Sequence, residues 1–547
     1  MAFNLIRDPW IPVTCRSGRI RVIRPAEIAL ADDPAMAPAW PRADFNLACL
    51  ELLIGLMRAA CPPSRDMVWK AEPPDAALLD ARLEALAPAF DLDGDGPRFL
   101  QDFETLQGEA NGIDMLLIDS AGAATSRKKA DLMARYGRYG RFGRAAAAMA
   151  LFTLQSQAPA GGAGNRTSMR GGGPMITLVE PRIEDAQGRV VPPDLYRMVW
   201  ANVPPGLALD PQDMALAFPW MRPTVTSEKG QAVQGGDHHP SQDKDIAVVE
   251  AFFGMPRRLR LVFTEVGADG RCDLTGDPDA RLATGVIQRP YGTNYGVWRH
   301  PLTPYYKVKG KDEEILPVHP KPGRFGYRNW LGVVLKDPEE GRLRADNVGV
   351  FLDSRIASYP RVELSLLVGG WAMSNMSPLD FVHARQPLFH FADDERRADM
   401  EFAAIGFVEA ARLVERNLLG AASTVFGDAG ADKGDGAELA ERFHAAVQGM
   451  IEKAVGALTA PGADPAEMAE ALRRDLHGVA FTLFDSVAIP GLAEREPEDA
   501  ARIVEARRNL GLMLSGYRKQ GQEFFDRLGL PIPEPKKRAG KAKEVPA

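Results

Sequence analysis

The spacing of apolar and polar residues predicts the first elements of the chain. The alternation over Arg19 to Ile23 is typical of a half-buried strand, and Phe3 to Ile6 is a second strand candidate. The apolar run from Phe45 to Ala60 predicts a buried helix that begins at the capping residue Asp44. A second helix is predicted over Ala76 to Ala87, just before a proline.

From about residue 91 to 380 the pattern becomes irregular. Glycine and proline are frequent, helical repeats are scarce, and short strand candidates lie at 175–179, 259–263 and 332–335. This pattern predicts one large, irregular, mixed α/β domain over residues 1–380, but it does not determine the topology of that domain.

Helical periodicity dominates the last part of the chain. In one segment, Leu472, Leu476 and Leu483 recur at the spacing of a single helix face. Such segments cover 394–420, 436–459, 465–487 and 497–528, and turn-rich connections separate them. We therefore expect an α+β protein whose domains are the mixed α/β domain (1–380), an antiparallel four-helix bundle (381–532) and a basic, disordered tail (533–547).

Composition and charge narrow the class of function. The chain has 547 residues, of which 45% are hydrophobic and 25% are charged, and its net charge is −7. This is an ordinary globular balance. The negative charge argues against a free, non-specific nucleic-acid-binding protein, because such proteins are usually basic. It still permits local basic loops that act inside a larger complex.

The cysteines and the apolar runs indicate a compartment. Cys15, Cys49, Cys61 and Cys272 include no C-x-x-C pair, so no cysteine-built metal site is predicted, and Cys49 is expected in the core. Sparse, unpaired thiols are typical of a reducing environment. The first residues lack the pattern of a signal peptide, and no apolar run is long enough to cross a bilayer. We expect a cytoplasmic protein without a membrane partner.

Two features support an enzyme as the alternative interpretation. Asp91 to Asp102 resembles a calcium loop, although Arg98 stands where an aliphatic residue is usual, and an ordinary turn is favoured. His238 and His239, together with that loop, would suit a metal-dependent hydrolase if they met in one cleft. No P-loop, G-x-S-x-G or H-E-x-x-H motif is present. We therefore predict no catalytic residue, no cofactor and no bound metal.

The segment from Arg127 to Arg144, called the basic segment below, is strongly positive. Seven basic residues minus one acid, Asp131, give a local charge of +6. Interleaved aromatic residues would supply stacking faces beside the phosphate-binding cations. We predict that this segment contacts nucleic acid, with a solvated loop as the alternative. Its candidate residues are Arg127, Lys128, Lys129, Arg135, Tyr136, Arg138, Tyr139, Arg141, Phe142 and Arg144.

Residues 160–174, called the glycine-rich segment below, are a second candidate. Small residues allow a phosphate or a groove to approach the backbone closely, because no large side chain blocks it. The spacing is not G-x-G-x-x-G, so a dinucleotide site is not indicated, and a flexible surface loop is the alternative. The small residues are Ala160, Gly161, Gly162 and Ala163, and Arg166 and Arg170 add positive charge.

Short motifs follow one another in a characteristic order along the chain. They stand at Asn4–Val13, Arg98–Gln101, Leu151–Gln155, Gln157–Pro159, Arg170–Gly172, Phe253–Arg258 and Gly369–Trp371. In this order and spacing, and followed by the predicted helices, they resemble the large subunit (CasA family) of the type I-E CRISPR Cascade surveillance complex.

The resemblance implies a non-catalytic subunit. Such subunits recognise the protospacer-adjacent motif (PAM) on double-stranded target DNA, mainly from the minor groove. They help to open the duplex so that the guide RNA can pair, and they help to recruit the helicase-nuclease. The implied partners are target DNA, the CRISPR RNA, the other Cascade proteins and the helicase-nuclease. Base pairing reads the rest of the target.

By position, the resemblance also implies site residues. The glycine loop of the family falls on Ala160 to Ala163, and its basic minor-groove finger falls on Arg289, which suits a narrow, electronegative groove. The wedge that splits the first base pair falls on Ser374, Asn375 and Met376, with Asn375 at the tip and Met376 as an apolar face.

Two further correspondences complete the comparison. The long loop of the family that contacts DNA and neighbouring subunits falls on about 126–143, which nearly coincides with the basic segment. The four-cysteine zinc site of some members falls on Gly143, Ala146, Cys272 and Thr275, so three thiols are missing and no zinc is expected.

From the residues alone, Arg289 could equally end a surface strand and Asn375 could form a turn. A purely structural scaffold is a third interpretation.

Overall fold

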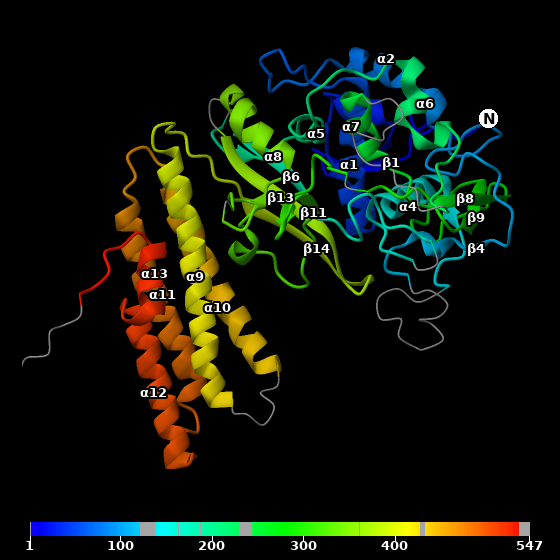
Figure 1. Ribbon diagram of the computed structural model, residues 1–547. Coiled ribbons are helices and arrows are strands. Elements are labelled where there is room, and N and C mark those ends of the chain that lie inside the picture. The colour runs from blue at the N-terminus through cyan, green and yellow to red at the C-terminus, as the bar shows by residue number, and fades with distance from the viewer. Residues whose placement is uncertain are drawn as a thin grey trace, which may run out of the picture. The chain divides into compact units, whose positions relative to one another are not determined.

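A computed structural model shows two compact units (Figure 1). It describes residues 2–120, 137–161, 164–185, 187–228, 243–296, 298–337, 339–359, 362–426 and 433–534. The first unit comprises Met1–Arg324 and Pro338–Leu388, and the second comprises Phe325–Asp337 and Phe389–Ala547. The expected boundary at residue 380 falls inside a strand, and the expected tail from 535 onward lies outside the described residues. The mixed helix-and-sheet class, with helices towards the C-terminus, is confirmed.

The described part of the first unit contains four sheets built from antiparallel strand pairs. Their strand orders are β2-β1-β3, β11-β10-β12, β14-β13-β6-β7 and β4-β9-β5, with β8 also paired to β9. The strands are β1 (Ile11–Cys15), β2 (Ile20–Ile23), β3 (Ala35–Pro38), β4 (Asn111–Gly112), β5 (Phe142–Gly143), β6 (Ile176–Glu184), β7 (Val190–Val191), β8 (Arg258–Glu265), β9 (Arg281–Arg289), β10 (Tyr305–Val308), β11 (Lys311–Pro317), β12 (Arg342–Leu343), β13 (Val362–Ser374) and β14 (Ser377–Pro387).

Helix α1 lies at the centre of the core of this unit. It packs against α2, α4, α5 and α7, and almost every residue along it is buried. A helix with apolar residues on all sides must be enclosed, so the apolar run, although interrupted by Asn46, Glu51 and Arg58, predicted this position correctly. The helices of the unit are α1 (Ala43–Ala60), α2 (Ala76–Leu86), α4 (Arg144–Gln157), α5 (Leu195–Trp200), α6 (Met214–Ala217), α7 (Lys244–Phe252) and α8 (Asp346–Val350).

Details of α1 confirm one prediction and correct another. Cys49 is fully buried, and burial raises the pKa of its thiol to about 12, so it is an unreactive core residue. The expected cap, Asp44, lies instead in the first turn of the helix, where its carboxylate pairs with the guanidinium of Arg42 at 2.8 Å. Arg42 is the residue at the N-cap position.

Two strand predictions are wrong. Over Phe3 to Ile6 the chain turns, because the Asn4 side-chain oxygen accepts hydrogen bonds from the amides of Ile6 and Arg7 at 3.1 Å each. Asparagine favours such local turns over strand pairing. At 332–335 the chain also turns, with the Gly332 amide donating to the Leu335 carbonyl at 2.8 Å.

The described part of the second unit is built mainly from helices. Helix α9 packs against α10, α11, α12 and α13, and Figure 1 shows the long helices lying side by side. The predicted fourth helix is divided, because Gly516 adopts a left-handed φ of 83° and the Tyr517 amide closes the turn on the Leu512 carbonyl at 2.9 Å. The helices are α9 (Arg397–Phe426), α10 (Lys433–Ala457), α11 (Pro465–Ala488), α12 (Pro497–Leu514) and α13 (Arg518–Arg527). No described helix has the length and hydropathy needed to cross a membrane.

Candidate nucleic-acid interface

The glycine-rich segment begins with an exposed, closed turn. The Gly161 amide donates to the Asn165 carbonyl at 3.2 Å, and the Asn165 side-chain amide donates back to the Gly161 carbonyl at 3.4 Å. Ala160 and Gly161 are exposed, whereas Gly162 and Ala163 lie outside the described residues. The small residues flanking the centre of this turn therefore present their backbone to the solvent.

The end of strand β9 lies directly against this turn. The Tyr291 amide donates to the Gly164 carbonyl at 2.9 Å, and the Gln288 side chain donates to the side-chain oxygen of Asn165 at 2.9 Å. A Cβ at Gly164 would lie 2.9 Å from the Tyr291 nitrogen, and φ there is +80°, so both the contact and the conformation require glycine. The strand end that carries Arg289 is thereby fixed to the glycine-rich segment.

Arg289 is an exposed cation at this junction. No hydrogen-bond or ion-pair partner of its guanidinium occurs among the described residues. Arg258, which lies opposite Arg289 on β8, is instead mostly buried and pairs with the Asp102 carboxylate at 2.7 Å. Of these two neighbouring arginines, Arg289 is the one whose charge is available to an external anion.

Tyr291 is a site residue that the sequence analysis did not single out. Its side chain is 41% exposed, and its φ of 61° places a bulky residue in the left-handed region, which is rare. The next residue, Gly292, packs closely against Pro256: a Cβ at Gly292 would lie 1.9 Å from the Pro256 carbonyl oxygen, so only glycine fits there. In the sequence, the run Pro290-Tyr291-Gly292 was the pattern that could have predicted a turn at this position. The exposed ring offers a stacking face beside Arg289.

Arg166 is fixed to the same junction. Its guanidinium Nε donates to the Ser227 hydroxyl at 2.9 Å, and that hydroxyl donates to the Gly292 carbonyl at 2.7 Å. The side chain is only partly buried, so the cation lies beside the β9 end while keeping some exposure.

The turn between β13 and β14, called the hairpin tip below (Ser374–Ser377), is exposed and strained. Ser374 pairs with Ser377, which leaves Asn375 and Met376 as a two-residue turn with φ values of 46° and 65°. Asparagine tolerates this conformation, whereas methionine pays about 1–2 kcal/mol for it. Met376 is also 48% exposed. An exposed apolar residue in a strained backbone conformation is a candidate for a role outside the fold.

The glycine-rich segment also contacts the strand that leads to this tip. A Cβ at Gly172 would lie 2.7 Å from the Pro159 Cα and 3.2 Å from the Met373 sulfur, and one at Gly173 would lie 2.2 Å from the Trp371 carbonyl oxygen. The structure thus joins the three predicted elements within one unit, with the glycine-rich segment touching both the β9 end and the β13–β14 hairpin.

The basic segment is described only from Gly137 onward. Arg127, Lys128, Lys129, Arg135 and Tyr136 lie outside the described residues. Arg138 is exposed and lies over the Tyr139 ring, with its guanidinium carbon 5.1 Å from the ring centre. Phe142 is fully buried, because β5 pairs with Ala283 of β9 and directs the ring into the core. Phe142 is therefore unavailable to stack on a base, and its prediction as a nucleic-acid contact is wrong.

The last two arginines of the basic segment have internal partners. Arg141 pairs with Asp273 at 3.4 Å, and Arg144, at the start of α4, pairs with Asp279 at 2.8 Å. The Arg144 guanidinium also lies 4.7 Å from the ring centre of Phe3. These contacts connect α4 to the loop before β9, so Arg144 has a structural role in addition to its charge.

We predict different effects for Arg138→Ala and Arg144→Ala. Loss of Arg138 should weaken binding to all DNA sequences alike and reduce the dependence of log affinity on log salt by about one. Loss of Arg144 should lower the free energy of unfolding by about 1–3 kcal/mol, because Asp279 is left without its cation. DNA titrations at several salt concentrations and urea unfolding measure the two effects. A sequence-selective loss in Arg138→Ala contradicts the first.

Arg170 does not add surface charge, contrary to expectation. It is 2% exposed, and its guanidinium contacts the Glu51 carboxylate at 2.5 Å and the Thr303 hydroxyl at 3.3 Å. His300 lies 3.3 Å from the same carboxylate. Burial opposes the Glu51 charge, but Arg170 and His300 outweigh it, so the Glu51 pKa lies below its ordinary value. This buried cluster anchors the middle of the glycine-rich segment to α1.

The lowered pKa of the buried His300 predicts that the protein loses stability on acidification. Burial, followed by the nearby Arg170 charge, lowers the pKa of His300 from 6.5 to about 4. As the pH falls, the unfolded chain therefore binds a proton at this histidine before the folded chain does. The contribution of neutral His300 to the free energy of unfolding is complete above pH 6.5 and falls between pH 6.5 and about 4, by up to about 3 kcal/mol. The free energy of unfolding, measured with urea at several pH values in this range, should depend less steeply on pH in His300→Gln than in the unsubstituted protein. Equal slopes contradict the prediction.

The groups proposed for a hydrolase are engaged elsewhere. Asp93 accepts from the Phe3 amide at 2.7 Å and pairs with Arg281 at 3.0 Å, and Asp102 pairs with Arg258. The favoured turn at Asp91–Asp102 is what the structure has, while His238 and His239 lie outside the described residues. Within the described ranges no three His, Cys, Asp or Glu side chains gather as a metal site would require.

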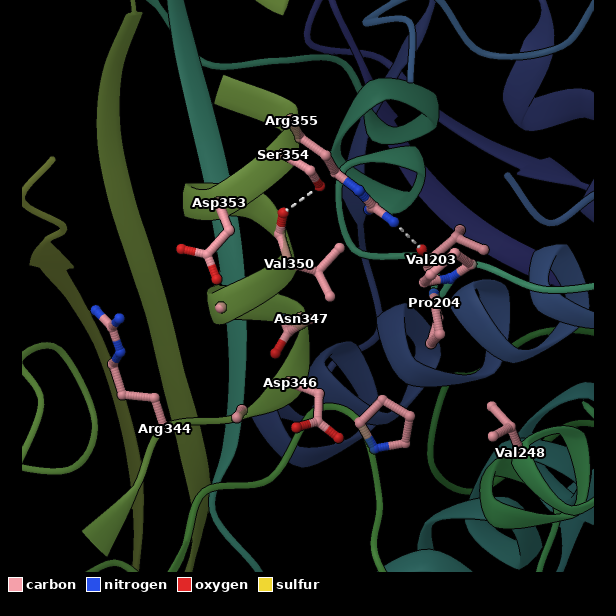
Figure 2. A pocket seen from close by; sticks show the side chains of 14 residues that line it. Val203, Pro204, Val248, Arg344, Asp346, Asn347, Val350, Asp353, Ser354 and Arg355 are labelled. Carbon is pink, nitrogen blue, oxygen red and sulfur yellow. Dashed lines mark hydrogen bonds between the residues drawn. The ribbon is translucent and has the colours of Figure 1, made fainter. Parts of the chain in front are cut away.

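Two cavities of the first unit differ in their relation to the predicted sites. Gly143, Ala146, Cys272 and Thr275 line one of about 420 Å³, so the positions matched to the family's zinc ligands do come together. A second cavity, of about 580 Å³, lies beside α8 (Figure 2). Its wall is largely apolar, with the carboxylates of Asp346 and Asp353 on one side. None of the predicted site residues lines it.

Comparisons with known proteins identify relatives. The family model described as CRISPR-associated protein Cse1 matches residues 4–483. Cse1 from Thermobifida fusca is similar with a TM-score of 0.68 at 19% identity, over 96% of this chain and 98% of that chain. CasA (Cse1) from Thermus thermophilus has a TM-score of 0.64 at 18% identity, over 96% and 99%. A chain of a CRISPR RNA-guided surveillance complex has a TM-score of 0.64 at 16% identity, over 93% and 99%.

Proposed function

Because the chain belongs to the CRISPR-associated protein Cse1 family, as its motifs predicted, we propose that it is the large subunit of a CRISPR RNA-guided surveillance complex and recognises the PAM on double-stranded target DNA. The observation that carries this proposal is the junction described above. An exposed glycine turn, an available cation at Arg289 and a strained hairpin tip belong to one unit and are joined through the glycine-rich segment.

Each part of the junction suits one task at a DNA groove. Arg289 enters the minor groove, where the electrostatic potential favours arginine. The backbone of Ala160, Gly161, Gly162 and Ala163 approaches the groove closely because these residues are small. Ser374, Asn375 and Met376 form the wedge that separates the first base pair, with the Met376 side chain against the unstacked bases. Arg166 and the cations of the basic segment hold phosphates.

The remaining parts of the proposal concern partners. The chain acts without catalysis of its own and binds the CRISPR RNA and the other protein subunits, with the helices of the second unit facing those subunits and the displaced strand. It also helps to recruit the helicase-nuclease, and it works in the cytoplasm. The support is the family membership and the fold shared with a chain of a CRISPR RNA-guided surveillance complex.

The test compares the reconstituted complex with and without this chain. The target is a duplex that matches the guide and carries randomised bases beside the matched region, at one stated salt concentration. We expect the complete complex to select a subset of flanking sequences and the complex lacking the chain to bind more weakly without selection. Equal binding and equal selection without the chain contradict the proposal.

A further inference from the structure

Arg257 lies against the described part of the glycine turn (160–161 and 164–165) and belongs to none of the predicted sites. Arg257 is buried, with 8% of its surface exposed. Its main chain is held by the Gln155 side chain of α4, which accepts from the Arg257 amide at 3.0 Å and donates to the Arg257 carbonyl at 3.0 Å. The arginine therefore starts from a fixed position in the core.

The guanidinium of Arg257 connects the two ends of the glycine turn. Its Nε donates to the Arg166 carbonyl at 2.9 Å, and its Nη2 donates to the Pro159 carbonyl. Its Nη1 would lie 3.2 Å from a Cβ at Gly161, so the planar group extends under the turn itself. One planar guanidinium thus fixes the separation of the residues that enter and leave the turn.

The charge of Arg257 has no counter-ion in the described part of the chain. Its hydrogen-bond acceptors are backbone carbonyls, and none of the ion pairs includes it. Burial lowers the pKa of its guanidinium to about 10, so the group is still a cation at neutral pH. A buried charge without a carboxylate partner is costly, which makes its position behind an exposed, anion-accessible backbone significant.

We infer that Arg257 is the positioning residue of the glycine turn: it fixes both ends of the turn and places an uncompensated positive charge behind the backbone that meets the DNA. A turn that is fixed in advance loses less conformational freedom on binding, and the charge strengthens the attraction of that backbone for an electronegative groove. The inference rests on the proposed function, because the role of the turn in DNA recognition is part of that proposal.

Arg355 provides a matched control in the same unit. It is 2% exposed, and its guanidinium donates to the carbonyls of Ala201 at 2.8 Å and Val203 at 2.6 Å, the latter shown in Figure 2. Burial lowers its pKa to about 10 as well. Arg355 and Arg257 are thus buried cations on backbone carbonyls, but only Arg257 touches the glycine-rich segment.

The experiment uses Arg257→Lys, Arg257→Gln, Arg355→Lys and Arg355→Gln in the reconstituted complex. Affinity is measured for two guide-matched duplexes, one with the flank preferred by the unsubstituted complex and one with a disfavoured flank. Amide hydrogen exchange of the full chain reports on the Ser168 amide, which donates to the Ala158 carbonyl at 2.9 Å across the base of the turn.

We expect both Arg257 variants to speed exchange at Ser168 and to reduce discrimination between the flanks by about tenfold to a hundredfold. Arg257→Lys keeps the charge, so it should retain the affinity for the disfavoured flank, which Arg257→Gln should lower. The Arg355 variants should leave both discrimination and Ser168 exchange unchanged. These splits distinguish positioning from a general loss of folding.

Three results would overturn the inference or its premise, and they differ. If the unsubstituted complex shows no flank preference, the proposed function itself fails. If it shows a preference that both Arg257 variants keep, Arg257 is only a core residue and the inference fails alone. If the Arg355 variants lose discrimination as much as the Arg257 variants do, the effect is a general loss of stability, and the inference is again rejected.

Discussion

Replacement of Arg289 by alanine should remove most of the selectivity of the complex for flanking sequence. The guanidinium is exposed at the end of β9 and has no partner among the described residues, and the Tyr291–Gly164 hydrogen bond fixes the strand end that carries it to the glycine turn. A specific groove contact of one arginine corresponds to about 1–3 kcal/mol, so affinity for the preferred flank should fall by about tenfold to a hundredfold. Affinity for disfavoured flanks should fall much less.

The measurement is selection from a randomised flank library at a stated salt concentration. Arg16→Ala is the matched control, because Arg16 is an exposed arginine of the same unit that lies between β1 and β2, outside the predicted site. It removes the same charge and should lower all affinities slightly and equally. Unchanged affinity and preference in Arg289→Ala would falsify the assignment of Arg289 and would favour the scaffold interpretation.

The helices of the second unit were predictable because their signal is local. Apolar residues such as Leu472 and Leu476 recur every three or four positions, and they are buried as that spacing implies. The error came at the fourth segment, where the periodic pattern continues across Ser515–Tyr517 while the Gly516 backbone turns. A glycine inside an amphipathic pattern can end a helix without disturbing the pattern on either side.

The sheets of the first unit were not predictable to the same degree. Strand β5 has only two residues, and its pairing partner on β9 lies far along the chain. No local pattern marks so short a strand. Phe142 stands in a run of arginines, aromatics and glycines that resembles an exposed nucleic-acid loop, yet this pairing buries it. Burial here depends on long-range pairing, which local spacing does not encode.

The same limit applies to charge. Arg166, Arg170 and Arg289 are equivalent in the sequence as isolated cations. The structure gives Arg170 a buried carboxylate, ties Arg166 to a hydroxyl and leaves Arg289 exposed. The resemblance nominated the glycine turn, Arg289 and the hairpin tip, but not the contacts at Gly164 and Gly172 that join them. Tyr291 was missed because its role depends on the contact with Gly164, and Arg257 was missed because its role depends on hydrogen bonds to Pro159 and Arg166.

Replacement of Met376 by glycine should slow the opening of a linear duplex while leaving the fold intact. An Asn-Gly pair is the preferred sequence for a two-residue turn with left-handed backbone, so Asn375 followed by glycine should keep the hairpin and relieve about 1–2 kcal/mol of strain. What is lost is the apolar side chain at the tip. Because unstacking one base step costs a few kcal/mol, we expect opening to slow by about tenfold.

A fluorescent base analogue at the first target position measures this opening, with a linear duplex compared against a target whose first base pairs are already mismatched. Met67→Gly is the control, because Met67 is 72% exposed in the same unit and lies outside the tip. A wedge acts only on paired bases, so the defect should appear with the linear duplex and vanish with the mismatched target. An equal defect on both targets would mean that Met376 contributes to binding in general, and no defect on either would mean that the exposed, strained methionine does not separate the strands.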